Sequence, residues 1–215
     1  GVDGTNDSGT GDWFTDENHH GTHVAGTIAG LANTVGVVGV MPNANIDLHI
    51  VKVFDAAGWA YSSTLVAAVQ KCEDNGADVV SMSLGGSFKS RTEDAAFRDF
   101  DKRGMLSIAA AGNDGNTRSS YPASYNSVVS VAAVDSNKVV ADFSQQNSQV
   151  ELAAPGVAVR STVPHGSGTD ESVSVGNDGY GAIAMEGSYQ TSDSGALVDC
   201  GIGDATCIGA TDKVC

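Results

Sequence analysis

Hydrophobic residues along this chain gather in short, nearly continuous runs that are separated by polar or amphipathic stretches. Such runs occupy residues 46–54, 78–84, 105–111, 128–134 and 150–154. Their length and their content of Val, Ile and Ala predict buried strands. Strands that are apolar throughout are typical of a parallel sheet with both faces covered. In such a sheet neither face meets water, so apolar and polar residues do not alternate along the strand.

Two segments between these runs carry apolar residues at helical spacing. The first helix is predicted to begin at the hydroxyls of Ser62–Thr64 and to end at Gly76. The second is predicted to begin near Thr92 and to carry Lys102 and Arg103 at its end, where the helix dipole favours positive charge. Strands and helices that alternate in this way predict an α/β fold.

The two ends of the chain lack a comparable pattern. Residues 1–19 are polar and are predicted to form a loop, and after Val163 the sequence becomes rich in Gly, Ser, Asp and Thr. We therefore expect a first domain over residues 1–164 and an insertion or edge region over residues 165–215.

Composition and charge narrow the function classes. The chain has 215 residues, 41% of them hydrophobic, and a formal net charge of -15. It is long enough to bury a substantial core, but it has no excess of positive charge for nucleic acid or anionic membranes. Its apolar runs are shorter than a bilayer span. The acidity is compatible with bound cations.

The four cysteines are unevenly placed. Cys72 stands alone, whereas Cys200, Cys207 and Cys215 lie in a segment with few apolar residues. This clustering favours disulfides in an oxidising compartment. A zinc site there is less favoured, because the segment has no C-x2-C pair and no His. The pairing is left open.

Two motifs carry candidate chemistry. Residues 20–30 read HGTHVAGTIAG and predict a helix whose first turn bears an imidazole, and residues 109–113 read AAAGN at the end of a strand. Together and in this order they resemble the histidine motif and the oxyanion-hole Asn of the subtilisin-like serine proteases. The resemblance covers about residues 18–164 and implies the three-layer subtilisin-like fold, with a mainly parallel central sheet and helices on both faces.

The resemblance assigns a role to each motif. His20 is expected to be the general base, Asn113 the side-chain donor to the oxyanion, and His23 a structural residue. A competing interpretation is a zinc site formed by His19, His20 and His23, since two of these lie four residues apart on a helix. The Glu of the H-E-x-x-H zinc motif is missing, however.

The resemblance also implies a peptide-binding site. Its three segments are an edge strand that pairs with the upstream part of the substrate, one wall of the primary specificity pocket, and the opposite wall. In this order they are Gly58, Trp59 and Ala60; Ser83, Leu84, Gly85 and Gly86; and Ala110, Ala111 and Gly112. Small walls predict a roomy pocket for large apolar or aromatic side chains. The motifs place no acidic residue at the bottom of this pocket, which disfavours substrates with basic side chains.

Structural calcium is the cofactor that the resemblance implies. The loop ligands would be the carbonyls of Leu31, Val35 and Val37 and the side chain of Asn33. A weaker cation site would use the carbonyls of Ala123, Tyr125 and Val128, next to a turn expected to contain a cis peptide bond before Pro122. The carboxylates of the first loop either bind a further calcium or form a solvated acidic loop: Asp7, Asp12, Asp16 and Glu17.

Two parts of the catalytic apparatus are not found in the sequence. Asp7-Ser8-Gly9 has the local pattern of the catalytic Asp, but Thr5 and Asn6 precede it instead of apolar strand residues. The nucleophile motif G-T-S-x-A-x-P does not occur, although residues 153–156 and 161–164 match the segments that normally precede it. The Asp strand is expected before Gly1 and the Ser helix after Cys215. Residues 165–215 would then lead into an insertion, by analogy with secreted bacterial subtilases that carry a protease-associated domain there.

Two functions from different classes follow. The first is a secreted, calcium-stabilised serine endopeptidase of proteins and peptides, with the remainder of the same protease as partner and no nucleic acid or membrane. The second is a non-catalytic scaffold that has lost the Asp and the Ser. The intact base, oxyanion donor and pocket glycines favour the first. The 215 residues alone are expected to hydrolyse no peptide.

Overall fold

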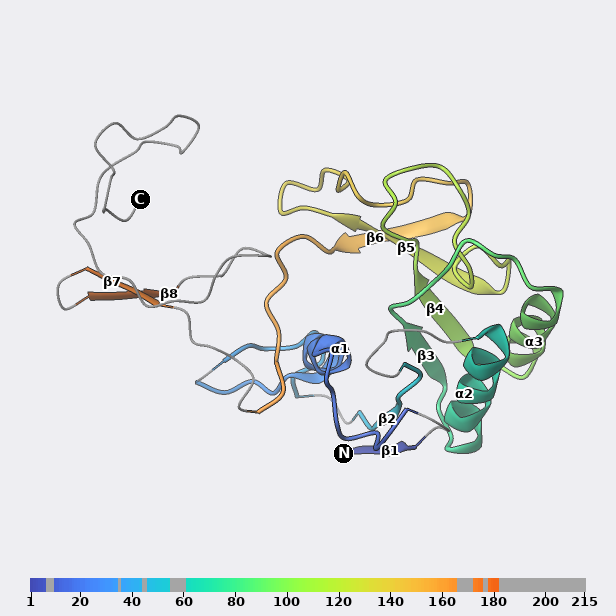
Figure 1. Cartoon of the computed structure of the whole chain (residues 1–215), viewed down its shortest axis with the longest axis horizontal. Coiled ribbons are helices and arrows are strands. Elements are labelled where there is room, and N and C mark those ends of the chain that lie inside the picture. Colours follow the sequence, from blue (N-terminus) through green and yellow to red (C-terminus); the bar gives the residue numbers. More distant parts are fainter. Residues whose placement is uncertain are drawn as a thin grey trace. The chain divides into compact units, whose positions relative to one another are not determined.

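A computed structural model describes residues 1–6, 10–34, 36–43, 46–54, 61–165, 172–175 and 178–181 (Figure 1). The chain divides into two compact units, Gly1–Gly168 and Thr169–Cys215. The elements of the first unit are, in chain order, β1 (Val2–Thr5), α1 (His20–Ala29), β2 (Leu48–Val51), α2 (Ser62–Asp74), β3 (Val79–Met82), α3 (Arg91–Lys102), β4 (Leu106–Ala110), β5 (Val128–Val134) and β6 (Val150–Pro155).

Four of these strands form a sheet in the order β3-β4-β5-β6, and every neighbouring pair is parallel. Val79 of β3 pairs with Leu106 of β4, and Ser107 of β4 pairs with Val128 of β5. The five apolar runs of the sequence therefore correspond to β2 and to the four strands of this sheet. The prediction of a parallel α/β sheet is confirmed.

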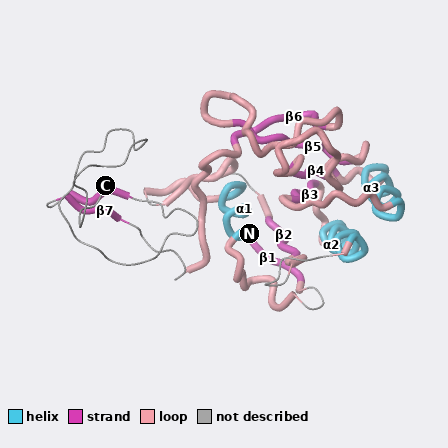
Figure 2. Tube along the Cα trace, turned by 45° about the horizontal axis from the view of Figure 1, so that its top comes forward, coloured by secondary structure: helices cyan, strands magenta, loops and turns pink. Residues whose placement is uncertain are grey.

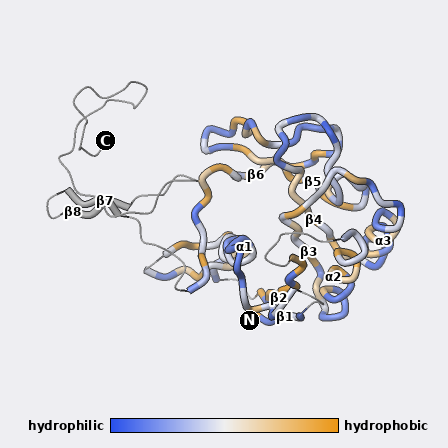
Figure 3. The backbone as a smooth tube through the Cα atoms, in the orientation of Figure 1, coloured by the Kyte–Doolittle hydropathy of each residue, from blue (hydrophilic) through white to orange (hydrophobic). Residues whose placement is uncertain are grey.

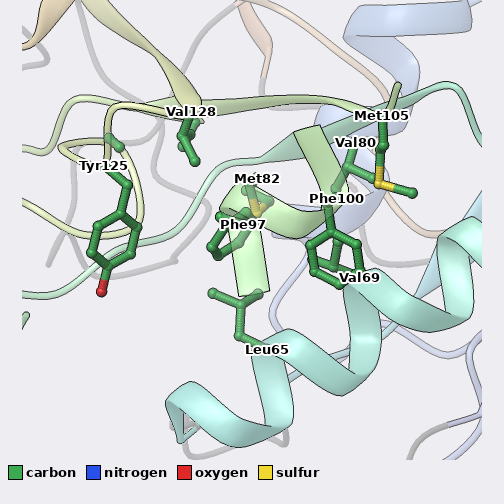
Figure 4. Close-up of a cluster of buried hydrophobic side chains, with 11 residues drawn as sticks. Leu65, Val69, Val80, Met82, Phe97, Phe100, Met105, Tyr125 and Val128 are labelled. Atoms are coloured by element: carbon green, nitrogen blue, oxygen red, sulfur yellow. The ribbon is translucent and has the colours of Figure 1, made fainter. Parts of the chain in front are cut away.

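Helices α2 and α3 cover one face of this sheet. Val80 and Met82 of β3 are buried against Val69 of α2 and Phe97 and Phe100 of α3 (Figure 4). Both helices mix hydrophobic and hydrophilic residues along their length, as helices buried on one side do (Figure 3). On the opposite face, Val79 is 54% exposed and Leu106 is 46% exposed.

The helix ends refine the sequence predictions. The N-cap of α2 is Tyr61 and makes no side-chain hydrogen bond, so Ser62 begins the helix and does not cap it. Helix α3 begins at Arg91, and the cap is Ser90, whose hydroxyl accepts a bond from the Glu93 N–H. The predicted end of α2 is confirmed, since Gly76 follows its last turn with φ +81°.

The prediction that residues 1–19 form only a loop is wrong. Val2–Thr5 is strand β1, which pairs in parallel with β2. The side chain of His49 on β2 lies 2.8 Å from both Asp3 Oδ1 and Thr5 Oγ1 of β1. An apolar run is absent because this strand is held by backbone pairing and polar side chains, and its Val2 is 63% exposed.

In the second unit, β7 (Ser172–Val175) and β8 (Asp178–Gly181) form an antiparallel pair. No element was predicted there. Cys72 is the one cysteine among the described residues and is not in a disulfide, and Cys200, Cys207 and Cys215 lie outside the described residues. Within the described ranges, no helix is long and apolar enough to cross a bilayer.

Candidate active site

Helix α1 places the predicted base at an exposed helix start. His20 is the first residue of α1, and the preceding His19 adopts a left-handed conformation with φ 69°. Asp16 caps this first turn from outside the helix. Its two carboxylate oxygens accept from the His19 N–H (2.9 Å), the Thr22 N–H (2.8 Å) and the Thr22 hydroxyl (2.7 Å). The predicted helix with an imidazole in its first turn is confirmed.

Hydrogen bonding also sets the charge state of Asp16. Burial alone would raise the pKa of this carboxyl, but the bonds from the Thr22 hydroxyl and from nearby backbone N–H groups outweigh it and lower the pKa below its usual value. Asp16 therefore stays ionised beside the positive end of the helix dipole. The sequence offered one signal for this role, an Asp just before a helix, where capping residues are common.

The other described carboxylates of this loop also have partners within the protein. Asp12 accepts from Asn6, and Glu17 pairs with Lys52 at 2.6 Å. Asp7 lies outside the described residues. The described part of the chain contains no group of three or more His, Cys, Asp or Glu side chains arranged to hold a metal ion.

A segment that is distant in the sequence, after β6, donates hydrogen bonds to backbone carbonyls of α1. Figures 1 and 2 show the loop after β6 passing beside α1. Within it, the Thr162 hydroxyl donates to the Thr22 carbonyl (2.8 Å) and the Ser161 hydroxyl to the His23 carbonyl (2.6 Å). Gly26 is buried here, and a Cβ at this position would lie 2.1 Å from Thr162 Oγ1. Thr22 is thus bonded on both sides, to Asp16 and to Thr162.

His23 has a partner that fits a structural role. Its Nε2 lies 3.1 Å from the Val159 carbonyl in the same loop. An imidazole that bonds a backbone carbonyl through this nitrogen is oriented toward the loop and does not offer that nitrogen to a metal. The arrangement gives no support to the zinc site proposed for His19, His20 and His23.

The predicted oxyanion donor lies on the turn that follows β4. Asn113 is exposed and comes directly after Gly112, whose φ of +113° is a backbone conformation that L side chains rarely adopt. This turn is at the carboxyl end of a parallel strand, which is where such sheets build ligand sites. Asn113 therefore lies after a strand end, where the motif placed it, and its role as oxyanion donor stays a prediction.

A pocket of about 400 Å³ opens beside Asn113. Both predicted walls contribute to it, and four lining residues were not predicted. The predicted ones are Ser83, Leu84, Gly85, Gly86, Ala110, Gly112 and Asn113, and the others are Ser87, Asp114, Ser119 and Ser120. Ala111 is 2% exposed and lines a different hollow of about 330 Å³.

Ser119 and Ser120 close the pocket because backbone pairing brings them there. Gly86 and Tyr121 exchange two backbone hydrogen bonds of 2.9 and 2.8 Å, and a Cβ at Gly85 would lie 2.8 Å from Ser120 Oγ. The sequence feature that could have indicated Ser119 and Ser120 is the adjacent Tyr121-Pro122 turn. Asp114 adds a carboxylate to the lining, whereas the sequence motifs indicate no acidic residue at the bottom of the pocket. The predicted edge strand Gly58, Trp59 and Ala60 lies outside the described residues.

The predicted calcium loop follows α1. Its base is closed by hydrogen bonds from Gly39 N–H to the Gly30 carbonyl and from Val40 N–H to the Thr27 carbonyl. No backbone hydrogen bond among the described residues uses the carbonyls of Leu31 or Val37. Val35, a further predicted ligand, lies outside the described residues. Hard carbonyl oxygens together with Asn33 are a donor set that fits calcium.

The predicted weaker cation site falls in a buried segment. The peptide bond between Tyr121 and Pro122 is cis, as expected. Ala123, Tyr125 and Val128 are each at most 3% exposed, and the Tyr125 carbonyl already accepts from the Val128 N–H at 3.0 Å. The Tyr125 hydroxyl donates to Glu93 at 2.6 Å, and burial raises the pKa of Glu93.

Comparisons with known proteins add independent information. Residues 2–200 match the model of the subtilase family. Subtilisin DY of Bacillus licheniformis is 46% identical over 154 residues, which are 70% of this chain and 56% of that protein. Alkaline elastase YaB of Bacillus sp. (strain YaB) is 44% identical over 151 residues, 70% of this chain and 39% of that protein.

A solved structure agrees with these matches. The psychrophilic subtilisin-like protease Apa1 from the Antarctic psychrotroph Pseudoalteromonas sp. AS-11 is 55% identical, with a TM-score of 0.75, and the match covers 83% of this chain and 42% of that one. The predicted subtilisin-like fold class is confirmed by this likeness. The chain spans about half the length of the curated relatives it matches.

Proposed function

The chain belongs to the subtilase family, and from this premise we propose that it supplies the general base and an oxyanion donor to a secreted serine endopeptidase. The observation that carries the proposal is the pocket beside Asn113, whose two predicted walls converge at the carboxyl ends of β3 and β4. His20 stands exposed at the capped start of α1. The nucleophilic Ser and the orienting Asp would come from polypeptide outside these 215 residues.

In this proposal His20 moves the proton in both halves of the reaction. As the Ser oxygen attacks the peptide carbonyl carbon, His20 takes the hydroxyl proton and the carbonyl electrons move onto oxygen. Asn113 donates its amide N–H to that oxyanion. When the tetrahedral intermediate collapses, the C–N bond breaks, and the imidazolium gives its proton to the leaving amine. Water then repeats the sequence and releases the acyl group.

We propose that the pocket of about 400 Å³ accepts the side chain on the acyl side of the cleaved bond. The glycine and alanine residues of its lining leave room for a large apolar or aromatic group. Asp114 adds one exposed carboxylate to the lining, so a basic side chain is a secondary substrate. The edge strand for the upstream residues is proposed at Gly58, Trp59 and Ala60.

Calcium is the proposed structural cofactor. It would be held by the carbonyls of Leu31, Val35 and Val37 and by Asn33, and a weaker cation by the carbonyls of Ala123, Tyr125 and Val128. When bound, calcium would tie down the loop that follows α1. Similarity to secreted bacterial proteases supports an extracellular location and protein substrates.

A fluorophosphonate probe tests the proposed activity. The protein is labelled as isolated from its source, and the labelled species is identified by intact mass and peptide mapping. We expect the adduct on a Ser of the polypeptide that carries this chain or of a companion piece. Labelling should be abolished by His20→Ala but not by Glu17→Gln, which removes a nearby exposed charge. Absence of an adduct and of peptide hydrolysis would favour the non-catalytic scaffold instead.

A further inference from the structure

A buried glutamine lies beneath the turn that carries the oxyanion donor. Gln145 is 1% exposed and belongs to the segment between β5 and β6. A glutamine side chain carries two donors and an acceptor, and leaving them without partners in a core is costly. Gln145 finds its partners in the turn after β4.

Hydrogen bonds from Gln145 reach both neighbours of Asn113. Its backbone N–H donates to the Gly112 carbonyl (3.0 Å), and its side-chain oxygen accepts from the Asp114 N–H (2.7 Å). Its side-chain amide donates to the Asp114 carboxylate (3.2 Å). The backbone on each side of Asn113 is therefore fixed by one buried residue.

The contact between Gln145 and the turn is also close sterically. A Cβ at Gly112 would lie 2.9 Å from Cδ of Gln145, so only glycine permits this approach without displacement. Two further backbone bonds join the same segments, from Gly115 N–H to the Phe143 carbonyl (2.7 Å) and from Gln146 N–H to the Asn116 carbonyl (2.9 Å). Hydrogen bonds therefore join the two segments from Gly112 to Asn116, and Gln145 bonds to the residue on each side of Asn113.

We infer that Gln145 is a positioning residue for Asn113. It does not touch the substrate, but it fixes the backbone from which the Asn113 amide must reach the developing oxyanion. Donors of this kind act because their geometry is set before the reaction. This inference rests on the proposed peptidase function.

A double-mutant cycle on the complete protease tests the inference. Asn113→Ala is expected to lower kcat by about 100- to 1,000-fold, the loss known for the oxyanion Asn of subtilisin. Gln145→Leu is expected to lower kcat by about 10- to 100-fold through misplacement of the donor, with a smaller change in KM. In the Asn113→Ala background, Gln145→Leu should reduce kcat by less than about twofold, because a missing donor cannot be misplaced.

The matched control is Gln149→Leu. Gln149 lies in the same segment, but its side chain donates to Asn126 and not to the oxyanion turn. It should leave kcat within about twofold of the wild type. If Gln145→Leu costs the same factor in both backgrounds, its role is structural and the inference is overturned. If Asn113→Ala has no effect on kcat, the proposed function fails as well.

Gln145→Glu keeps the inference testable if the Leu variant does not fold. The introduced carboxyl can still accept from the Asp114 N–H, but once ionised it cannot donate to the Asp114 carboxylate. The ratio of its kcat to that of the wild type should therefore fall as the pH rises through the pKa of the new group, and taking this ratio removes any pH dependence that the two enzymes share. A ratio that does not change with pH would contradict a positioning role.

Discussion

The two regions that carry the candidate catalytic groups are held in opposite ways. The first turn of α1, with exposed His20, is fastened from outside by Asp16 on its N–H groups and by Thr162 and Ser161 on its carbonyls. The turn with Asn113 is fastened from beneath by buried Gln145. One region depends on partly exposed charge and hydroxyl groups, and the other depends on packing and buried hydrogen bonds.

This difference suits the two tasks. A general base must gain and lose a proton near a solvent-exposed helix end, where water and neighbouring charges are within reach. An oxyanion donor must not move, because its contribution depends on a preset distance to the developing charge. We therefore expect the first turn of α1 (the base side) to respond to changes in pH. We expect the turn with Asn113 (the oxyanion side) to respond to added side-chain volume.

The largest effect is expected from the base itself. His20→Ala in the complete protease should reduce kcat by about 10⁶-fold, as loss of the catalytic His does in subtilisin, because no other group takes the Ser proton. The measurement is steady-state hydrolysis of a chromogenic peptide, with active-site titration of the enzyme.

The control at the neighbouring position is His19→Asn. Asn tolerates the left-handed conformation of His19 and keeps the N–H that bonds Asp16. Its kcat should stay within about threefold of the wild type. A comparable collapse of activity in both variants, together with a loss of wild-type activity on chelation that added zinc restores, would instead support the histidine metal site.

Added volume on the oxyanion side should give the next largest effect. Gly112→Ala introduces a Cβ at φ +113° and 2.9 Å from Gln145. Strain of about 1–3 kcal/mol is expected, together with roughly a tenfold loss of kcat as the turn shifts. The free energy of unfolding is measured by urea titration after fluorophosphonate inactivation, which prevents self-digestion.

Gly104→Ala separates strain from displacement. Gly104 also has a positive φ, +95°, but nothing lies within 4 Å of its Cβ position. This variant should lose stability and keep its kcat. If Gly112→Ala also kept its kcat, the oxyanion turn would not be the rigid element described above.

Elements and motifs could be predicted where the pattern lies within a single short segment of the sequence. The strands β3 to β6 were predicted because each is a short apolar run rich in Val, Ile or Ala. His20 and Asn113 could be proposed as site residues because each lies inside a local motif, and the structure places these motifs at a helix start and after a strand end. Strand β1 was missed because it has no apolar run: its Val2 is 63% exposed, and its polar side chains lie against His49 of β2.

The residues that fix the segments of His20 and Asn113 could not be predicted, because they are far in the sequence from the residues to which they bond. Gln145 is 31 positions from Asp114, and Thr162 is 140 positions from Thr22. The sequence around a buried Gln or a half-buried Thr does not indicate its hydrogen-bond partner, so these pairs can be recognised only in the folded chain. The same holds for Ser120 in the pocket lining, which is brought there by the pairing of Gly86 with Tyr121.

The charge dependence of the base side is tested through Asp16. Asp16→Asn should cost about 1 kcal/mol, because an amide replaces a carboxylate that accepts three hydrogen bonds. The folded state lowers the pKa of Asp16, so its stabilisation is complete above the unfolded value of about 3.9 and is lost as the pH falls through the folded pKa. The difference in unfolding free energy between wild type and variant should be constant from about pH 5 to pH 8 and should shrink below about pH 4.

Glu17→Gln is the matched control for Asp16. Glu17 is the next residue and pairs with Lys52, but it makes no bond to α1. Its effect should be smaller and should weaken as salt is added, because the Glu17 carboxylate is exposed to solvent. A difference for Asp16→Asn that grew at low pH would show that the carboxylate does not cap α1 in its ionised form.

The smallest expected effect concerns substrate choice at the pocket. Asp114 is exposed, so its attraction for a basic side chain is worth at most about 1 kcal/mol in water. Asp114→Asn should therefore lower kcat/KM for a Lys substrate by about two- to fivefold and leave a Phe substrate unchanged. The new amide oxygen can still accept the bond that Gln145 donates, so the oxyanion turn should stay in place. Asp101→Asn, an exposed charge on α3, controls for net charge. A loss that was equal for Lys and Phe substrates would mean that the variant moved Asn113, and the oxyanion side would then be less rigid than its buried hydrogen bonds imply.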